Sequence, residues 1–248
     1  PGEDPGEDPG RARDADLALK LNAADLACVG RPAAVEPAQQ LAPRTRVIAL
    51  PPALGLRWLR PRRPGPRNGR LLCLAPPGTP EGRATLLQAL ALLPAAQRPV
   101  IDLPRQVHGL VPLMQQAAAL GLAPWLDPRL EAEELAQAAP AWLGLLVPEA
   151  AAAIPGLLHG MALQLPVLAV GEDLADIVLP GFGHLLPPGQ PQPLARGLRW
   201  LSLMPEDQRL LFGRAARDQV LAQHTAERRA ARLLQALGRC APRRARRA

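Results

Sequence analysis

The sequence predicts an α/β fold, a Rossmann-like, doubly wound parallel sheet followed by a helical C-terminal segment. After Leu71, short apolar runs alternate with segments of helical pattern. Parallel strands need such crossover connections, which are usually helices. The stretch Gly156–Gly171 joins a helix of small and apolar residues to the strand-like run LPVLA, and Gly183–Leu198 continues as a turn-rich loop leading into another helix. This order is typical of the nucleotide-binding half of an α/β protein.

Individual elements follow from local patterns. The strand candidates are short apolar runs at Asp25–Val29, Arg46–Leu50, Leu71–Ala75, Pro99–Leu103, Ala123–Leu126, Trp142–Val147 and Pro166–Val170. The helix candidates are Ala34–Leu41, Pro80–Leu93, His108–Leu120, Glu131–Ala138, Ala150–Leu163, Pro193–Leu203, Pro205–Gln223 and Thr225–Leu237. Thr79 is the expected N-cap of the helix that begins at Pro80, because a Thr hydroxyl accepts a first-turn N–H and Pro is tolerated at the first helical position.

Composition disfavours nucleic acid as a partner. Hydrophobic residues make up 48% of the 248 residues, yet aromatic residues make up 2% and there is no Tyr. A site for single-stranded nucleic acid stacks bases on aromatic rings, which this chain scarcely has. The net charge of +7 comes largely from Arg in segment 60–70 and in the tail. A phosphate contact through the C-terminal RRARR stretch is therefore the weakest of the functional alternatives.

Cysteine usage and hydropathy indicate the cellular location expected for this chain. Cys28, Cys73 and Cys240 are odd in number and lack the spacing of a metal site or a disulfide framework. A reducing, cytoplasmic location is expected, with no metal and no cofactor. The apolar stretch Ala141–Val170 is interrupted by three prolines, so it is not expected to span a membrane. Peripheral contact with a membrane stays open.

Three stretches resemble, in the right order, GT-B glycosyltransferases of the "glycosyl transferases group 1" type. Ala24–Pro61 resembles the interdomain crossing, in which "ADxVxAVS", a helix, "RVxVIPNGVD" and "RFRP" follow one another. Leu71–Leu93 is similar to the "GRLxPEKGxxxLLxAL" opening of the C-terminal domain. Leu157–Leu198 is similar to "LLEAMAxGLPVVA", "GG…E.V" and "GxLVPPGDPEALAxAL". The similarity covers nearly everything from Ala24 to Leu237.

The resemblance implies a donor-binding half with an N-terminal acceptor domain almost wholly missing. It implies metal-independent, retaining transfer from a UDP-, GDP- or ADP-linked sugar, with the acceptor side on another domain or a partner chain. The expected segments are a disordered acidic tail (1–13), a remnant of the N-terminal domain and crossing (14–59), a linker (60–70), the nucleotide-sugar-binding domain (71–203), C-terminal helices (204–238) and a basic tail (239–248).

The family's phosphate-binding loop is altered in this sequence. Family members carry an Arg and a Lys in "GRLxPEKG" that neutralise the donor diphosphate. Pro76 or Pro77 stands at the Arg position and Gly82 at the Lys position. Arg83, one place later, is a candidate for a phosphate contact. An exposed arginine on a helix surface is an equally good interpretation.

The family's E-x7-E pair is also replaced. Its glutamates hold the sugar and the ribose, since a carboxylate accepts hydroxyl hydrogen bonds. Ala151 stands at the first position and His159 at the second, while Glu149 lies two residues upstream of the first. Glu149 could substitute if the loop shifts. His159 could bond a ribose hydroxyl, but a structural histidine is the preferred interpretation.

The last candidates for donor binding are Gly181 and Gly183, whose backbone N–H groups could approach a phosphate. Ordinary turn glycines are the simpler interpretation of both. No catalytic residue is identified. Two hypotheses follow: the donor half of a glycosyltransferase, or a non-catalytic interaction module, a pseudoenzyme, derived from the same fold. The lost loop cations and glutamates motivate the second.

Overall fold

The computed structural model describes residues 17–60, 67–131, 135, 141–149 and 154–239. The chain divides into two compact units, Leu54–Thr225 and a smaller one formed by Pro1–Ala53 with Ala226–Ala248. Several predictions lie outside the described residues: the acidic tail, most of the linker and of the basic tail, most of the helix Glu131–Ala138, and the position of Ala151.

The larger unit is built on a parallel sheet, as predicted, and its described residues form six strands. Their order across the sheet is β5-β4-β3-β6-β7-β8, and every neighbouring pair is parallel. The strands are β3 (Leu71–Leu72), β4 (Ile101–Pro104), β5 (Leu126–Leu130), β6 (Gly144–Val147), β7 (Val167–Val170) and β8 (Gly183–Leu186).

Two strands differ from the prediction. The predicted strand Ala123–Leu126 is wrong for most of its length, because Ala123–Trp125 is a 3-10 helix with Pro124 in its first turn, and β5 begins only at Leu126. The edge strand β8 was not predicted as a strand. Its sequence, GHLL, has one Gly, one exposed His and no β-branched residue, and it runs directly into two prolines.

Helices connect β3 to β4, β4 to β5 and β6 to β7: these are α4 (Pro80–Leu92), α5 (Leu110–Ala119) and α7 (Ile154–Ala162). Helices α8 (Pro191–Leu203) and α9 (Glu206–Gln223) follow the last strand, and the short α3 (Leu56–Leu59) precedes β3. Of these five helices and α3, only α3 has no counterpart among the predicted helices. The expected cap of α4 is confirmed, since the Thr79 hydroxyl accepts the Gly82 N–H at 3.0 Å and Pro80 is the first helical residue.

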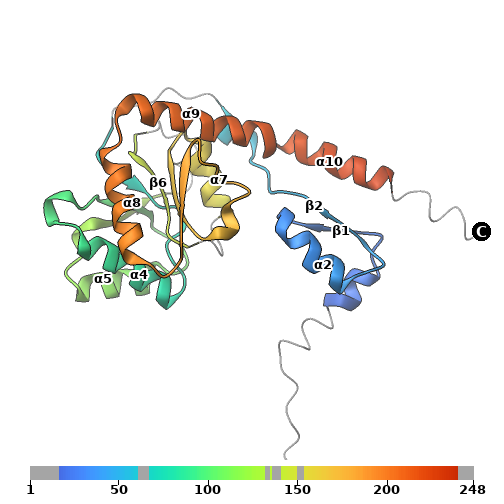
Figure 1. The fold of residues 1–248 in the computed structure, drawn as a ribbon, viewed down its shortest axis with the longest axis horizontal. Coiled ribbons are helices and arrows are strands. Elements are labelled where there is room, and N and C mark those ends of the chain that lie inside the picture. The colour runs from blue at the N-terminus through green and yellow to red at the C-terminus, as the bar shows by residue number, and fades with distance from the viewer. Residues whose placement is uncertain (1–16, 61–66, 132–134, 136–140, 150–153, 240–248) are drawn as a thin grey trace, which may run out of the picture. The chain divides into compact units, whose positions relative to one another are not determined.

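Alternation along the strands covers both faces of the sheet. In β6, Leu146 packs with the core that includes α4, α5 and α8, whereas Leu145 and Val147 pack with the core that includes α7 and α9. Figure 1 shows α4 and α8 on one side of β6 and α7 on the other. Both faces are therefore buried, which is the condition under which an all-parallel sheet is stable.

The smaller unit contains a parallel pair, β1 (Leu26–Val29) and β2 (Arg46–Ala49), joined through α2 (Val35–Leu41). The helix α10 (Ala226–Gly238) belongs to the same unit, and Arg229 of this helix donates a hydrogen bond to the Pro51 carbonyl at 3.1 Å. A helix over residues 17–22 was not predicted.

The predicted segments 14–59 and 204–238 are each divided between the two units, at residues 53/54 and 225/226. Helix α9 belongs to the larger unit, because Phe212, Ala216 and Val220 pack into its core. Helix α10 buries only Ala236 and belongs to the smaller unit. Within the described part of the chain, no helix has both the length and the apolar character needed to cross a membrane.

Candidate functional site

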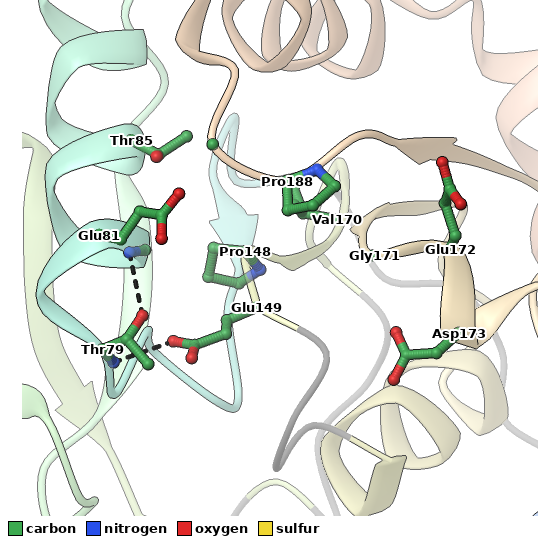
Figure 2. Close-up of a pocket in the computed structure, with 12 residues that line it drawn as sticks. Thr79, Glu81, Thr85, Pro148, Glu149, Val170, Gly171, Glu172, Asp173 and Pro188 are labelled. Atoms are coloured by element: carbon green, nitrogen blue, oxygen red, sulfur yellow. Dashed lines mark hydrogen bonds between the residues drawn. The ribbon is translucent and has the colours of Figure 1, made fainter.

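A cavity of about 660 Å³ opens at the carboxyl ends of four parallel strands in the larger unit. β3 and β6 are neighbours, but the chain leaves them toward opposite halves of the sheet. Ligands of open α/β sheets bind at such a switch point, and small-molecule sites usually have volumes of about 300–1,000 Å³. The lining residues are Thr79, Glu81, Gly82, Thr85, Pro148, Glu149, Val170, Gly171, Glu172, Asp173, Pro188 and Gly189 (Figure 2).

The charged side chains that line this cavity are all acidic. They come from α4 (Glu81), from the residue pair after β6 (Glu149) and from the turn after β7 (Glu172 and Asp173). None of the described lining residues is Lys or Arg. Carboxylates accept hydrogen bonds from sugar and ribose hydroxyls. They repel an anionic group unless a cation intervenes.

Glu149 follows β6 in the sequence, and its side chain contacts the N-terminus of α4. Its Oε2 accepts the Thr79 N–H at 3.1 Å, and Figure 2 shows the carboxylate pointing across the cavity toward Thr79. A Cβ placed on Gly82 would lie 2.9 Å from the same oxygen. The Glu149 carboxylate therefore lines the cavity beside the first turn of α4.

Arg83 does not line the cavity. Its side chain is buried, and Nη1 donates a hydrogen bond to the Gly78 carbonyl at 2.6 Å. The guanidinium thus ties the first turn of α4 back to the loop that precedes it.

His159 is a partly buried residue of α7 in the larger unit. Its ring stacks on Trp58 of α3, with centroids 3.9 Å apart and planes inclined by 22°. Burial, aided by the positive charge of Arg57, lowers the pKa of His159 from 6.5 to about 4. The side chain is not among those lining the cavity. This environment supports the structural interpretation of His159.

Gly181 and Gly183 lie at the amino end of strand β8, away from the cavity. Gly183 opens β8, so it marks the amino end of a strand, whereas the cavity is at the carboxyl ends. Two other glycines line the cavity, Gly171 after β7 and Gly189 after β8. Gly171 has φ 123° and Gly189 has φ 68°, conformations that favour glycine.

The state of His159 predicts a pH dependence of stability. The unfolded chain gains a proton on this ring as pH falls through 6.5, whereas the folded chain gains it only near pH 4. Stability is therefore lost as pH falls from about 7 toward 4. For this partly buried ring we expect a loss of about 1 kcal/mol between pH 7.5 and pH 5. Urea denaturation of wild type and His159→Gln at both pH values checks this, and equal pH dependence in the two proteins would contradict it.

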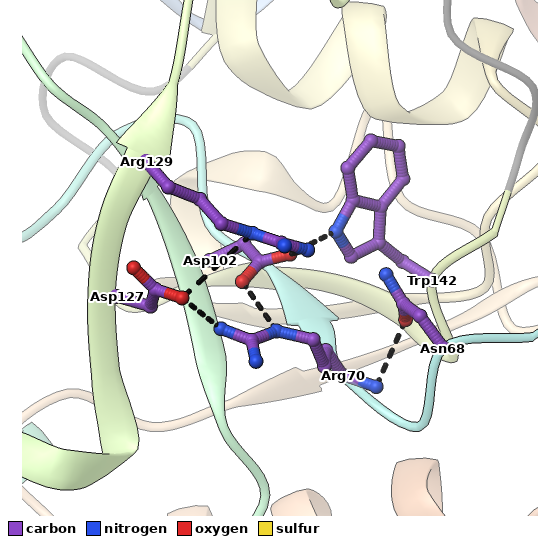
Figure 3. A network of polar contacts seen from close by, with 6 residues as sticks. All are labelled: Asn68, Arg70, Asp102, Asp127, Arg129 and Trp142. Carbon is purple, nitrogen blue, oxygen red and sulfur yellow. Dashed lines mark hydrogen bonds and ion pairs between the residues drawn. The ribbon is translucent and has the colours of Figure 1, made fainter.

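A second polar cluster, not predicted from the sequence, lies on β4, β5 and the segments before β3 and β6 (Figure 3). The Asp102 carboxylate is fully buried. Oδ1 accepts from Arg70 Nε at 2.6 Å, while Oδ2 accepts from Arg129 Nη2 at 2.7 Å and Trp142 Nε1 at 2.8 Å. Asp127 pairs with Arg70 as well. The hydrogen bond that Arg129 donates to Asp102 raises the pKa of Arg129. Every oxygen of Asp102 is satisfied by protein, so we assign this cluster to stability.

The acidic lining residues Glu172 and Asp173 were also missed. They follow β7 (Val167–Val170) after one residue, Gly171, and β7 lies within the predicted strand Pro166–Val170. Since parallel strands expose functional residues at their carboxyl ends, the position of Glu172 and Asp173 after a predicted strand was the available signal.

In the described residues, no group of three or more His, Cys, Asp or Glu is arranged to hold a metal ion.

The fold and the cavity define an α/β protein with a cavity at the switch point of a doubly wound parallel sheet. The sequence matches no protein-family model and no curated protein. Solved structures do match, and they give the chain a GT-B glycosyltransferase fold.

Three of these structures illustrate the similarity. Sucrose-phosphate synthase from Thermosynechococcus elongatus is 19% identical, with a TM-score of 0.72 over 92% of this chain. A glycosyltransferase from Rickettsia africae is 14% identical, with a TM-score of 0.71 over 92%. Anabaena HepE in complex with UDP and glucose is 15% identical, with a TM-score of 0.73 over 93%. The chain spans 61% of the first of these proteins and 68% of each of the others.

Proposed function

We propose that this chain is the donor-side half of a glycosyltransferase, and that its cavity binds a nucleotide sugar for retaining, metal-independent transfer. The observation that carries the proposal is the position of the cavity, at the carboxyl ends of β3, β6, β7 and β8. Nucleotide ligands bind at this place in open α/β sheets. The similarity to HepE, whose structure holds UDP and glucose, supports the same assignment.

The lining residues suit the hydroxyl-rich parts of such a donor. Glu81, Glu172 and Asp173 can each accept two hydroxyl hydrogen bonds from a sugar or a ribose. The backbone N–H group of Gly189 can approach a ligand closely, because glycine has no side chain of its own. The Gly171 N–H already donates to the Leu186 carbonyl at 3.0 Å. The acceptor would bind to further polypeptide, since the matched donor-side fold spans 61% of a full-length neighbour.

A second candidate is a non-catalytic interaction module, and one observation favours it. Gly82 stands where the family has its Lys, and the cavity carries four carboxylates and, among its described residues, no Lys or Arg. A diphosphate would thus lack the cations that stabilise its growing charge during transfer. Such a module would keep the fold for contact with a partner.

Calorimetric titration with UDP, GDP and ADP separates the two candidates. We expect heat with one of them, with a dissociation constant in the millimolar range or below, and the same affinity with Mg²⁺ or EDTA. Pro188→Trp places a ring at an exposed residue of the cavity wall and should weaken binding about tenfold or more. Leu211→Trp, at an exposed position on α9, is the matched control.

The opposite result would be equally clear. An absence of heat with all three nucleotides at millimolar concentration would exclude donor binding by this chain and would favour the interaction module. Equal affinities of the wild type and Pro188→Trp would show that any binding occurs elsewhere.

A further inference from the structure

Glu149 occupies the part of the cavity where an anionic ligand would otherwise bind. The N-terminus of a 13-residue helix, α4, faces this cavity, and such a terminus attracts anions through its free N–H groups and its dipole. Two of these N–H groups are already used by the protein. Thr79 N–H donates to Glu149 Oε2, and Gly82 N–H donates to the Thr79 hydroxyl.

The space in front of the helix is filled as well. The Glu149 oxygen lies 2.9 Å from where a Cβ of residue 82 would be, so the carboxylate lies against the first turn of α4. The nearest arginine along the helix, Arg83, donates to the Gly78 carbonyl and does not line the cavity. The Glu149 carboxylate thus lies against the first turn of α4, which also carries the acidic residue Glu81.

The consequence depends on the charge of the ligand. A diphosphate must displace the Glu149 carboxylate from the Thr79 N–H, or lie beside it and pay the repulsion between like charges. A neutral nucleoside or sugar meets neither obstacle, because it can use the other carboxylates as hydroxyl acceptors. The apparent affinity for the diphosphate is then reduced by the fraction of molecules in which Glu149 occupies the helix terminus.

We propose that the Glu149 carboxylate occupies the place at the N-terminus of α4 where a ligand phosphate would bind, and that it thereby lowers the affinity of the cavity for diphosphate ligands. This inference rests on the proposed donor site. In the wild type, a nucleoside should bind about as well as its diphosphate. Removal of the Glu149 carboxylate should free the Thr79 N–H and reverse that order.

The test compares three proteins with nucleoside and diphosphate pairs, namely uridine with UDP, guanosine with GDP and adenosine with ADP. Glu149→Ala should raise the affinity for the diphosphate of the recognised base by about tenfold. The affinity for the nucleoside should change by less than about twofold. Glu172→Ala is the matched control, because it removes the same charge from the opposite side of the cavity. It should raise diphosphate affinity by less than about threefold.

Each other outcome has a distinct meaning. An unchanged diphosphate affinity in Glu149→Ala, with the nucleoside still bound, would overturn the inference and leave the donor site intact. An equal gain in both variants would replace it with a general effect of cavity charge. An absence of binding by any ligand to any of the three proteins would overturn the donor site and this inference together. Urea denaturation of each variant establishes that it is folded.

Discussion

Replacing Asp102 by Asn lowers the free energy of unfolding by about 3–5 kcal/mol, which is the largest effect we expect from one substitution in this chain. Asp102 is fully buried on β4 and its two oxygens accept hydrogen bonds from Arg70, Arg129 and Trp142. Asparagine has nearly the same shape but no charge, and its amide group would face donors. Two guanidinium groups would then lose the anion that offsets their desolvation.

Asp127→Asn is the matched control for this prediction. The same chemical change is made in the same cluster, but the Asp127 side chain is 39% exposed and bonds at the outer side of Arg70. We expect a loss of about 1 kcal/mol or less there, because exposed ion pairs contribute little. Urea denaturation, followed by circular dichroism, measures both values. Equal losses in the two variants would show that the burial of Asp102 is not what makes it important.

Arg209→Met is expected to cost about 2–4 kcal/mol. The Arg209 side chain is 3% exposed, and it donates to three backbone carbonyls, those of Leu143, Leu201 and Met204. Two of these carbonyls belong to the C-terminal end of α8, where the helix itself supplies no donors. Burial lowers the pKa of Arg209, as expected for a cation whose partners are mostly neutral carbonyls. Methionine fills similar space but leaves these carbonyls without a donor.

The control for this variant is Arg214→Met, on the same helix but at an exposed position. Its effect should stay within about 0.5 kcal/mol. Thermal and urea denaturation should rank the two variants in the same order. A stable Arg209→Met protein would mean that water reaches the end of α8 and satisfies its carbonyls.

The sheet could be predicted from the sequence because burial on both faces leaves a simple pattern. The central strands β6 and β7 are continuous apolar runs, and α4 begins with a Thr-Pro pair whose capping chemistry is local. The edge strand β8 was missed, because its short GHLL run has few strand-forming residues. The start of β5 was misplaced, because Pro124 initiates a 3-10 helix where apolar composition indicated a strand.

Of the residues predicted to bind the donor, only Glu149 lines the cavity. Glu149 was identified because the resemblance located it near a lost glutamate, and it does line the cavity. The bond from Thr79 N–H to its carboxylate joins residues 70 positions apart, a pairing that no local pattern encodes. The stacking of His159 on Trp58 likewise joins residues far apart in the sequence. The Asp102 cluster likewise depends on the pairing of β4 with β5.

The central claim, that the cavity at the carboxyl ends of the strands binds a nucleotide sugar, is tested most directly by hydrogen exchange. Backbone exchange is measured by mass spectrometry with and without a saturating concentration of UDP-glucose, GDP-mannose or ADP-glucose. We predict slower exchange, with one of the three, in residues 79–85, 170–173 and 188–190, which line or adjoin the cavity. Residues 181–183, at the amino end of β8, should not change. Unaltered exchange around the cavity with all three donors, or protection confined to the amino ends of the strands, would contradict the claim.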